Sequence, residues 1–385
     1  MTAKMEKWTF VGCPMPPQWN IDWNELISQY PLLDSLADCV QDKNYHQEGD
    51  VLTHTKMVCQ SLIEDEQWQS LPQYERSLLF AAALFHDVGK PAKTEVEADG
   101  RITSFGHARK GARLVRSMFY RRNLASFETR ELLFDLVRYH AISRQWVNRK
   151  DAQVDVIRAT MRAPGKLLAL LGRADSLGRV CDDREESAEG PELFAQLCQD
   201  IGCFEKPYRF PSPLSRFLYL NGKRPSPDLT AYDESKFRVV MMAGLPGAGK
   251  DSWLKRQRDK GREIAQMPII SLDEIRKRMK VSPADNQGQV VDAAKEEARK
   301  LLRQEKSFVW NATNVSRTLR QSLVSLFRRY GARVNIVYCE TAYSELLRRN
   351  EERQAHVPLK VIEYLINKLE IPTYEEAEEA EWSLS

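Results

Sequence analysis

Residues 238–259 read RVVMMAGLPGAGKDSWLKRQRD, an apolar run that leads through a glycine-rich turn into a helical pattern. The apolar run is typical of a buried strand. The turn carries the spacing GxxxxGK, whose glycines let backbone N–H groups surround a polyphosphate while Lys250 reaches the outer phosphates. The stretch therefore predicts a strand, a phosphate-binding loop and a helix in succession. The predicted nucleotide-binding residues are Gly244, Leu245, Pro246, Gly247, Ala248, Gly249, Lys250, Asp251 and Ser252.

Position 251 departs from the usual pattern, in which Ser or Thr follows the lysine. Asp251 stands there, and Ser252 comes next. The magnesium contact could come from the carboxylate, from the Ser252 hydroxyl or through a water molecule. We expect Asp251, in place of Ser or Thr, to affect how the magnesium ion is coordinated more than whether a nucleotide binds.

Downstream of the loop, short β-rich runs alternate with longer helical patterns. The runs MPIIS, SFVWN and RVNIVYC are each followed by an amphipathic helical stretch. Strand alternating with helix indicates parallel βαβ units, so we expect an α/β P-loop kinase domain with a parallel sheet over residues 237–385. The last stretch, which contains EEAEEAEW, is acidic, and we expect a solvated end there.

Two charged pairs suit phosphoryl transfer. Asp273 and Arg276 lie three residues apart, where a carboxylate could accept a hydroxyl proton and an arginine could hold a phosphate. Arg349 and Arg353 lie one helical turn apart and could close over the transferred group. Taken alone, Asp273 would be a helix cap, and the second pair could equally form a solvated basic face.

The motifs GLPGAGKDS, SLDEIR, NATN and RNEER occur in this order and together resemble the kinase domain of phage-type and bacterial polynucleotide kinases. The resemblance implies a 5′-hydroxyl kinase that uses ATP or another nucleoside triphosphate with Mg²⁺. It places Lys250 on the donor phosphates, Asp273 as general base and Arg276 on the acceptor's 3′-phosphate. Arg349 and Arg353 would be lid arginines.

The first half of the chain has helical periodicity throughout, as in YERSLLFAAALFHDV and GARLVRSMFYRRNL. We expect an all-α domain over residues 25–205, with a leader over 1–24 that packs on it. Five of the 18 prolines lie from Pro207 to Pro227, which predicts a Pro-rich linker over 206–236.

Four of the chain's six histidines stand in an ordered set with two aspartates. Imidazole and carboxylate ligands suit a divalent transition metal, and Asp87 could bridge two ions. A lone buried histidine would more often be structural, but an ordered set with an intact HDxGK motif favours metal binding. The predicted metal ligands are His54, His86, Asp87, His107, His140 and Asp175.

The segments HQEGDVLTHT, HDVGKP, GHARKGARL, VRYH and ADSLGR resemble the HD phosphohydrolase superfamily, and the HD domain of tRNA nucleotidyltransferases in particular. This resemblance implies a metal-dependent phosphoesterase. His54, His86, Asp87 and Asp175 would form one metal site, while His107 and His140 with Asp87 allow a second. Lys90 and Arg179 would face the substrate phosphate. His46 could be a substrate or proton-transfer group, or a surface residue.

An HD domain placed ahead of a polynucleotide-kinase-like domain resembles the bacterial HD-Pnk family of RNA end-healing enzymes. The resemblance implies phosphorylation of 5′-hydroxyl ends together with hydrolysis of 2′,3′-cyclic phosphate or 2′-phosphate ends. It also implies RNA or DNA ends as partners, a downstream RNA ligase, and one or two Mn, Ni or Co ions in the HD site. Two alternatives stay open: a nucleotidase joined to a nucleoside kinase for free nucleotides, and an RNA-binding adaptor with an inactive kinase.

Composition excludes several other classes. A net charge of +3 argues against a strongly basic arm, and the longest apolar run, eight residues at 78–85, is far below the ~20 that span a membrane. No secretory signal pattern opens the sequence, so we expect a cytoplasmic protein without membrane partners. Seven cysteines without a CxxC pair predict reduced thiols.

Overall fold

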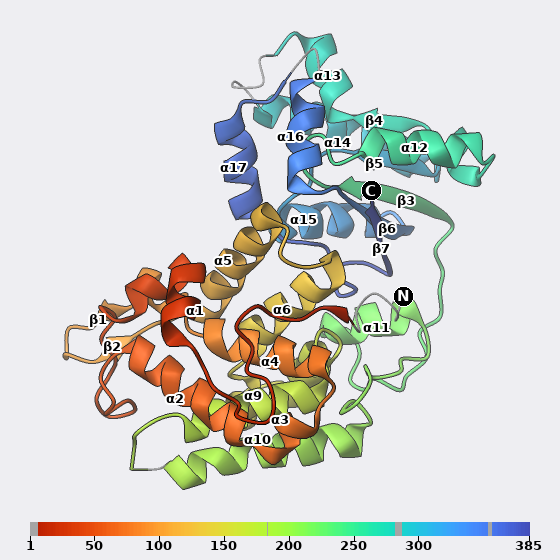
Figure 1. Ribbon diagram of the computed structural model, residues 1–385. Coiled ribbons are helices and arrows are strands. Elements are labelled where there is room, and N and C mark those ends of the chain that lie inside the picture. Colours follow the sequence, from red (N-terminus) through yellow and green to blue (C-terminus); the bar gives the residue numbers. More distant parts are fainter. Residues whose placement is uncertain (1–6, 183, 282–286, 353–355) are drawn as a thin grey trace. The chain divides into compact units, whose positions relative to one another are not determined.

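The computed structural model describes residues 7–182, 184–281, 287–352 and 356–385 (Figure 1). The chain divides into two compact units, Met1–Arg209 and Phe210–Ser385. Among the described residues, no helix is long and apolar enough to cross a membrane.

The first unit is helical, as predicted. Its only strands among the described residues form a short antiparallel hairpin, β1 (Glu95–Val96) and β2 (Ile102–Thr103). The helices are α1 (Trp23–Gln29), α2 (Val51–Glu64), α3 (Glu66–Ser70), α4 (Gln73–Phe85), α5 (His107–Arg122), α6 (Phe127–Tyr139), α7 (Ile142–Gln145), α8 (Ala152–Thr160), α9 (Gly165–Leu177) and α10 (Arg184–Ile201).

Helix α4 is the centre of this unit. Its apolar run 78–85 is completely buried, and the helix packs against α2, α6 and α9. A helix that is apolar on all sides must be enclosed by others, which explains why the longest apolar run of the chain lies here. The polar residues His86 and Asp87 follow the last turn of α4 and are thereby held inside the unit.

The leader packs on the helices through its aromatic residues. The ring of Phe10 stacks on Tyr30 with the centroids 5.0 Å apart and meets Phe85 edge to face at 5.8 Å. The indole nitrogen of Trp8 donates to the carbonyl oxygen of Leu124 over 2.9 Å. The segment from residue 7 onward is therefore part of the helical core.

The second unit confirms the predicted α/β fold with a five-stranded parallel sheet. The strand order is β4-β5-β3-β6-β7, and every neighbouring pair is parallel. The strands are β3 (Phe237–Ala243), β4 (Ile269–Ser271), β5 (Phe308–Asn311), β6 (Ala332–Glu340) and β7 (Glu379–Leu384). The helices are α11 (Pro213–Leu220), α12 (Lys250–Asp259), α13 (Leu272–Met279), α14 (Gln287–Arg303), α15 (Arg317–Arg328), α16 (Tyr343–Glu351) and α17 (Leu359–Lys368).

Strand β3 lies in the middle of the sheet, and its residues are almost all buried. Met242 is opposite Asn311 of β5 on one side and Val337 of β6 on the other. The carboxyl ends of these strands therefore meet at one edge of the sheet, directly where the glycine-rich loop begins. Ligands of open parallel sheets bind at this edge.

The acidic end of the chain is not a solvated tail, in contrast to the expectation from its charge. Residues 379–384 form β7, which pairs with β6. Glu375, Glu376 and Glu378 are buried and form ion pairs with arginines of α15. Charge density alone suggested exposure, but three arginines far away in the sequence compensate these carboxylates inside the fold.

The segment predicted as a linker contains helix α11, which lies in the second unit. Asn221 at its end donates to the carbonyl oxygen of Glu375 over 3.0 Å, and Arg216 donates to the carbonyl oxygen of Glu378 over 2.7 Å. The Pro-rich segment thus carries a structural element that holds the turn before β7.

The Arg320–Glu376 pair is expected to be essential for the stability of the second unit. Arg320 is fully buried, and its Nε and Nη2 atoms lie 2.7 and 2.9 Å from the Glu376 carboxylate. Arg320→Ala leaves a buried carboxylate without its cation, so we expect a loss of about 3–5 kcal/mol in the free energy of unfolding. Urea denaturation, followed by tryptophan fluorescence, measures this loss.

Arg348→Ala is the matched control, because Arg348 also forms ion pairs with glutamate, here Glu345 and Glu352, but is more than half exposed. Exposed pairs contribute about 0–1 kcal/mol. Equal losses in the two variants would show that burial of the Arg320–Glu376 pair is not what stabilises the unit.

Candidate functional sites

Six side chains that the sequence predicts as metal ligands lie together in the first unit. They come from elements far apart in the sequence, and α4 is the element around which the others pack. His54 lies on α2, His86 and Asp87 follow α4, His107 begins α5, His140 follows α6 and Asp175 lies on α9. Only packed helices could gather these positions.

Three of these residues form a first group of possible ligands, His54, His86 and Asp175. The Nε2 atom of His54 lies 3.2 Å from Asp175 Oδ1 and 3.3 Å from His86 Nε2. Asp87 Oδ2 lies 3.1 Å from His86 Nε2, so this carboxylate faces the same group. All four side chains are about 1–2% exposed.

A second group combines Asp87 with His107 and His140. The other carboxylate oxygen of Asp87, Oδ1, lies 3.2 Å from His107 Nε2 and 3.9 Å from His140 Nε2. Asp87 therefore presents one oxygen to each group. This is the arrangement in which one carboxylate can bridge two ions.

The orientation of each imidazole is fixed by a backbone carbonyl. The Nδ1 atom of each ring donates a hydrogen bond, which leaves the lone pair on Nε2 directed at the carboxylates. The acceptors are Gly178 O for His54, Ala83 O for His86, Ser104 O for His107 and Val137 O for His140, at 3.1, 2.7, 2.8 and 2.8 Å. Rings held in this tautomer can bind a metal through Nε2.

The chemistry of the cluster fits divalent cations. Asp87 Oδ1 and His107 Nε2 are buried and have no hydrogen-bond partner, which is costly unless another ligand satisfies them. Burial raises the pKa of Asp87, but the charges of His86 and Lys90 outweigh burial and hold that pKa well below its usual value. Burial lowers the pKa of His140 to about 3, so its ring is the neutral form that a metal requires.

Three cations surround the carboxylates of the cluster. Lys90 Nζ lies 2.7 Å from Asp87 Oδ2, and Arg179 Nη2 lies 3.6 Å from Asp175 Oδ1, so both predicted phosphate-facing residues lie at the cluster. Arg144, which the sequence analysis did not single out, lies closest, with Nη2 at 2.5 Å from Asp175 Oδ2. No motif marks Arg144, since only the packing of α7 on α9 brings it to Asp175.

His46 also lies at the cluster, beside a second residue that the sequence analysis missed. Glu48 Oε1 lies 2.8 Å from His46 Nδ1 and 3.0 Å from His54 Nδ1, while the backbone N–H of Val180 donates to Oε2 over 3.0 Å. Burial lowers the pKa of His46 to about 4, so the ring is neutral near pH 7. Glu48 contacts His54 at Nδ1, so it is placed to orient this ring and not to take its place as a metal ligand.

Two glycines permit the close packing around the cluster. A Cβ atom at Gly89, in the HDVGK motif, would lie 2.1 Å from the carbonyl oxygen of His107. A Cβ atom at Gly178 would lie 2.5 Å from the Cα atom of Val58 on α2. Side chains at these positions would push α5 and α2 away from the cluster.

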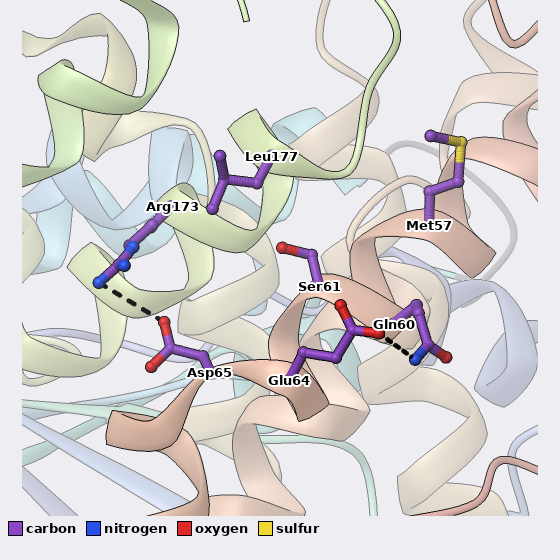
Figure 2. Close-up of a pocket in the computed structure, with 7 residues that line it drawn as sticks. All are labelled: Met57, Gln60, Ser61, Glu64, Asp65, Arg173 and Leu177. Atoms are coloured by element: carbon purple, nitrogen blue, oxygen red, sulfur yellow. Dashed lines mark hydrogen bonds and ion pairs between the residues drawn. The ribbon is translucent and has the colours of Figure 1, made fainter. Parts of the chain in front are cut away.

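A separate hollow is lined by residues of α2 and α9. The lining residues are Met57, Gln60, Ser61, Glu64, Asp65, Arg173 and Leu177 (Figure 2). Gln60 donates to Glu64 over 2.6 Å, and Arg173 pairs with Asp65 at 3.6 Å. None of the six predicted ligands lines this hollow, and its polar groups bind one another.

The glycine-rich loop of the second unit lies between β3 and α12. Gly247 and Gly249 have φ of +82° and +92°, and a Cβ atom at Gly244 would lie 2.4 Å from the carbonyl oxygen of Cys339. Lys250 Nζ donates to the carbonyl oxygens of Gly244 and Leu245, each over 3.0 Å. The lysine thus lies over the loop. If a polyphosphate bound there, its oxygens would replace these carbonyl oxygens as partners of the Lys250 ammonium group.

The NATN segment holds the start of this loop. Asn314 is buried with φ of +44°, and its Nδ2 atom donates to the carbonyl oxygen of Met242 over 2.6 Å. The backbone N–H of Gly244 donates to the carbonyl oxygen of Thr313 over 2.8 Å. Asn311, at the end of β5, donates through Nδ2 to Asp251 Oδ1 over 2.8 Å.

Asp273 lies on the first turn of α13 and is 72% exposed, with Arg276 Nη1 at 2.5 Å from its Oδ1 atom. The cap of this helix is Ser271, whose hydroxyl accepts from the backbone N–H of Glu274. The helix-cap alternative for Asp273 is therefore wrong, and the carboxylate is accessible to a substrate.

Arg349 lies against the loop. Its Nη1 atom would be 3.4 Å from a Cβ atom at Gly249, and its Nε atom donates to Glu345 over 2.6 Å. Arg353, the second predicted lid arginine, lies outside the described residues.

Comparison with known proteins agrees with this division. The family model of the HD domain matches residues 51–179, and that of an AAA domain matches residues 239–372. A crystal structure of a candidate kinase from Chloroflexus aurantiacus is similar at 13% identity with a TM-score of 0.32, covering 38% of this chain and 87% of that one. The two family matches place an HD domain ahead of a P-loop domain in one chain, which implies divalent metals in the first domain and a nucleotide with magnesium in the second.

Glu48 is expected to tune metal affinity through His54. In Glu48→Gln, an NH2 group replaces one carboxylate oxygen, and this group donates hydrogen bonds but does not accept them. The one remaining oxygen cannot accept both from the two histidines and from the backbone N–H of Val180. Loss of such an orienting partner typically weakens metal binding about 10–100-fold. Titration calorimetry of the metal-free chain with Mn²⁺ measures the change.

Glu64→Gln serves as the control, because Glu64 is an exposed residue of the same helix that contacts no predicted ligand. Unchanged Mn²⁺ affinity in Glu48→Gln would contradict the orienting role of Glu48.

Proposed function

We propose that this protein is a bifunctional enzyme that repairs nucleic-acid ends, with RNA as the favoured substrate. Its P-loop domain would phosphorylate 5′-hydroxyl ends with ATP or another nucleoside triphosphate. Its HD domain would hydrolyse 2′,3′-cyclic phosphate or 2′-phosphate ends. One observation carries the proposal. The chain combines a buried His/Asp cluster, flanked by Lys90, Arg144 and Arg179, with a P-loop domain that has an accessible Asp273–Arg276 pair. This combination resembles the HD-Pnk family.

The kinase step uses the residues of the second unit. Asp273 accepts the proton of the 5′-hydroxyl group, whose oxygen forms a bond to the γ-phosphorus. The bond from that phosphorus to the β–γ bridging oxygen breaks, and the nucleoside diphosphate leaves with Lys250 on its phosphates. Arg276 holds the acceptor's 3′-phosphate, while Arg349 and Arg353 compensate the charge of the transferred group.

The hydrolytic step belongs to the first unit. His54, His86, Asp87 and Asp175 would hold one divalent ion such as manganese, nickel or cobalt, and His107 and His140 with Asp87 would hold a second. Such an ion supplies activation of water and polarisation of a phosphate oxygen. Lys90, Arg144 and Arg179 bind the phosphate, since their charges already converge on the ligands. His46 is the nearest further group for proton transfer.

One kind of RNA break produces the substrates of both proposed activities. When a 2′-hydroxyl attacks its own backbone, the break leaves a 2′,3′-cyclic phosphate on one side and a 5′-hydroxyl on the other. Removing the first and phosphorylating the second prepares both ends for a ligase, which is the expected downstream partner in the cytoplasm.

A single substrate tests both activities. An RNA oligonucleotide with a 5′-hydroxyl and a 2′,3′-cyclic phosphate is incubated with the full chain, ATP, Mg²⁺ and either Mn²⁺, Ni²⁺ or Co²⁺, and both ends are followed by mass spectrometry. We expect gain of a 5′-phosphate and loss of the terminal phosphate. Preference for mononucleosides over the oligonucleotide would favour the free-nucleotide alternative, and ATP binding without turnover would favour the adaptor.

Substitution of one aspartate in each unit should separate the activities. Asp273→Ala removes the general base, so we expect 5′-phosphorylation to fall about 10²–10⁴-fold while phosphate removal continues. Asp87→Ala removes the carboxylate shared by the two ligand groups, so we expect the opposite pattern. The oligonucleotide assay measures both variants, and loss of both activities in either folded variant would contradict the two-site assignment.

A further inference from the structure

The P-loop domain of this chain departs from the usual pattern at two positions. In P-loop enzymes a hydroxyl follows the loop lysine, and an acidic residue at the end of a neighbouring strand supports the magnesium ion. Here the position after Lys250 carries a carboxylate, Asp251, and the end of β5 carries an amide, Asn311. The acidic side chain therefore stands in the first turn of α12 and not at the end of β5.

The structure shows that the side chains at these two positions contact each other. Asn311 Nδ2 donates to Asp251 Oδ1 over 2.8 Å, between the first turn of α12 and the last residue of β5. An amide can satisfy one carboxylate oxygen and leave the other for a second partner. Because β5 pairs directly with β3, the hydrogen bond holds the Asp251 side chain beside the loop that follows β3.

We propose that Asp251 is the side chain that binds the magnesium ion of the bound nucleotide, and that Asn311 is the residue that positions it. The proposal rests on the proposed use of a nucleoside triphosphate at this loop. Carboxylate oxygens are preferred magnesium ligands, and magnesium sites commonly combine one or two carboxylates with substrate phosphates. Ser252 is one residue further along α12 and points about 100° away around the helix axis.

The charge of Asp251 has a consequence that a hydroxyl would not have. Without a cation, a carboxylate beside the loop repels the polyphosphate; with magnesium, it attracts the ion that the phosphates carry. Nucleotide binding to this chain should therefore depend strongly on magnesium. The same reasoning predicts that removing the charge improves metal-free binding.

The test measures binding of a fluorescent ATP analogue to the full chain by anisotropy, with Mg²⁺ and with EDTA. For the unaltered chain we expect Mg²⁺ to tighten binding by about tenfold or more. In Asp251→Asn, which keeps the shape of the side chain, we expect tighter binding in EDTA and a magnesium effect of less than about threefold. Ser252→Ala tests the alternative ligand, and Asp259→Asn, which removes an exposed carboxylate at the far end of α12, is the control; both variants should keep the full magnesium effect.

The double variant Asp251→Asn, Asn311→Asp returns the acid to the strand end and should recover part of the magnesium effect. Electron paramagnetic resonance of Mn²⁺ added with the nucleotide gives a second readout that is independent of turnover, and Asp251→Asn should lose the ternary signal. Thermal unfolding of each variant shows that the fold is kept.

The outcomes separate this inference from the proposed function. A full magnesium effect in Asp251→Asn, or its loss in Ser252→Ala, would overturn the role of Asp251 while leaving the kinase proposal intact. If the unaltered chain binds no nucleotide under either condition, the kinase proposal and this inference both fail.

Discussion

A carboxylate placed inside a helical unit needs positive charge around it, and the first unit is arranged to supply that charge at Asp87. Moving an ionised group out of water costs several kcal/mol unless it is paired and hydrogen-bonded. Asp87 is 2% exposed, with Lys90 Nζ at 2.7 Å and four histidine rings facing its two oxygens. The buried apolar run 78–85 of α4 leads directly to this acid, and α2, α5, α6 and α9 bring the other side chains of the cluster to it.

Buried carboxylates are also paired with cations in the second unit, at a position that serves only the fold. The buried glutamates before β7 are matched by arginines of α15, and this pairing attaches the end of the chain to the sheet. Here every cation already has an acid, and the pairs hold the fold. Around Asp87, by contrast, one carboxylate oxygen and one imidazole nitrogen have no hydrogen-bond partner. That difference distinguishes a structural network from a site that can accept a ligand.

The loop of the second unit relies on backbone geometry instead of buried charge. Its glycines adopt positive φ, which frees the N–H groups to face an anion, and the NATN segment fixes where the loop starts. The contact between Asn311 and Asp251 adds a side-chain constraint at the position where metal chemistry is expected. Fold and site therefore depend on the same few residues at the end of β3 and β5.

Much of this could be predicted from the sequence. Local patterns are sufficient where a property repeats along the chain: the apolar runs that became β3 to β6, the amphipathic helices of the first unit, and the GxxxxGK and HDxGK spacings. The six predicted ligands come together because each stands at a helix end or on a helix face that periodicity already indicates.

Other features were decided only by the tertiary structure. Glu48 and Arg144 reach the cluster through the packing of distant segments, and no local pattern distinguishes them from other charged residues. Strand β7 was missed because its acidic surroundings suggested solvent, while the arginines that compensate them lie about 50 residues earlier. Sequence determines what each segment can form by itself; which charges meet depends on contacts between segments, and only the folded chain decides those contacts.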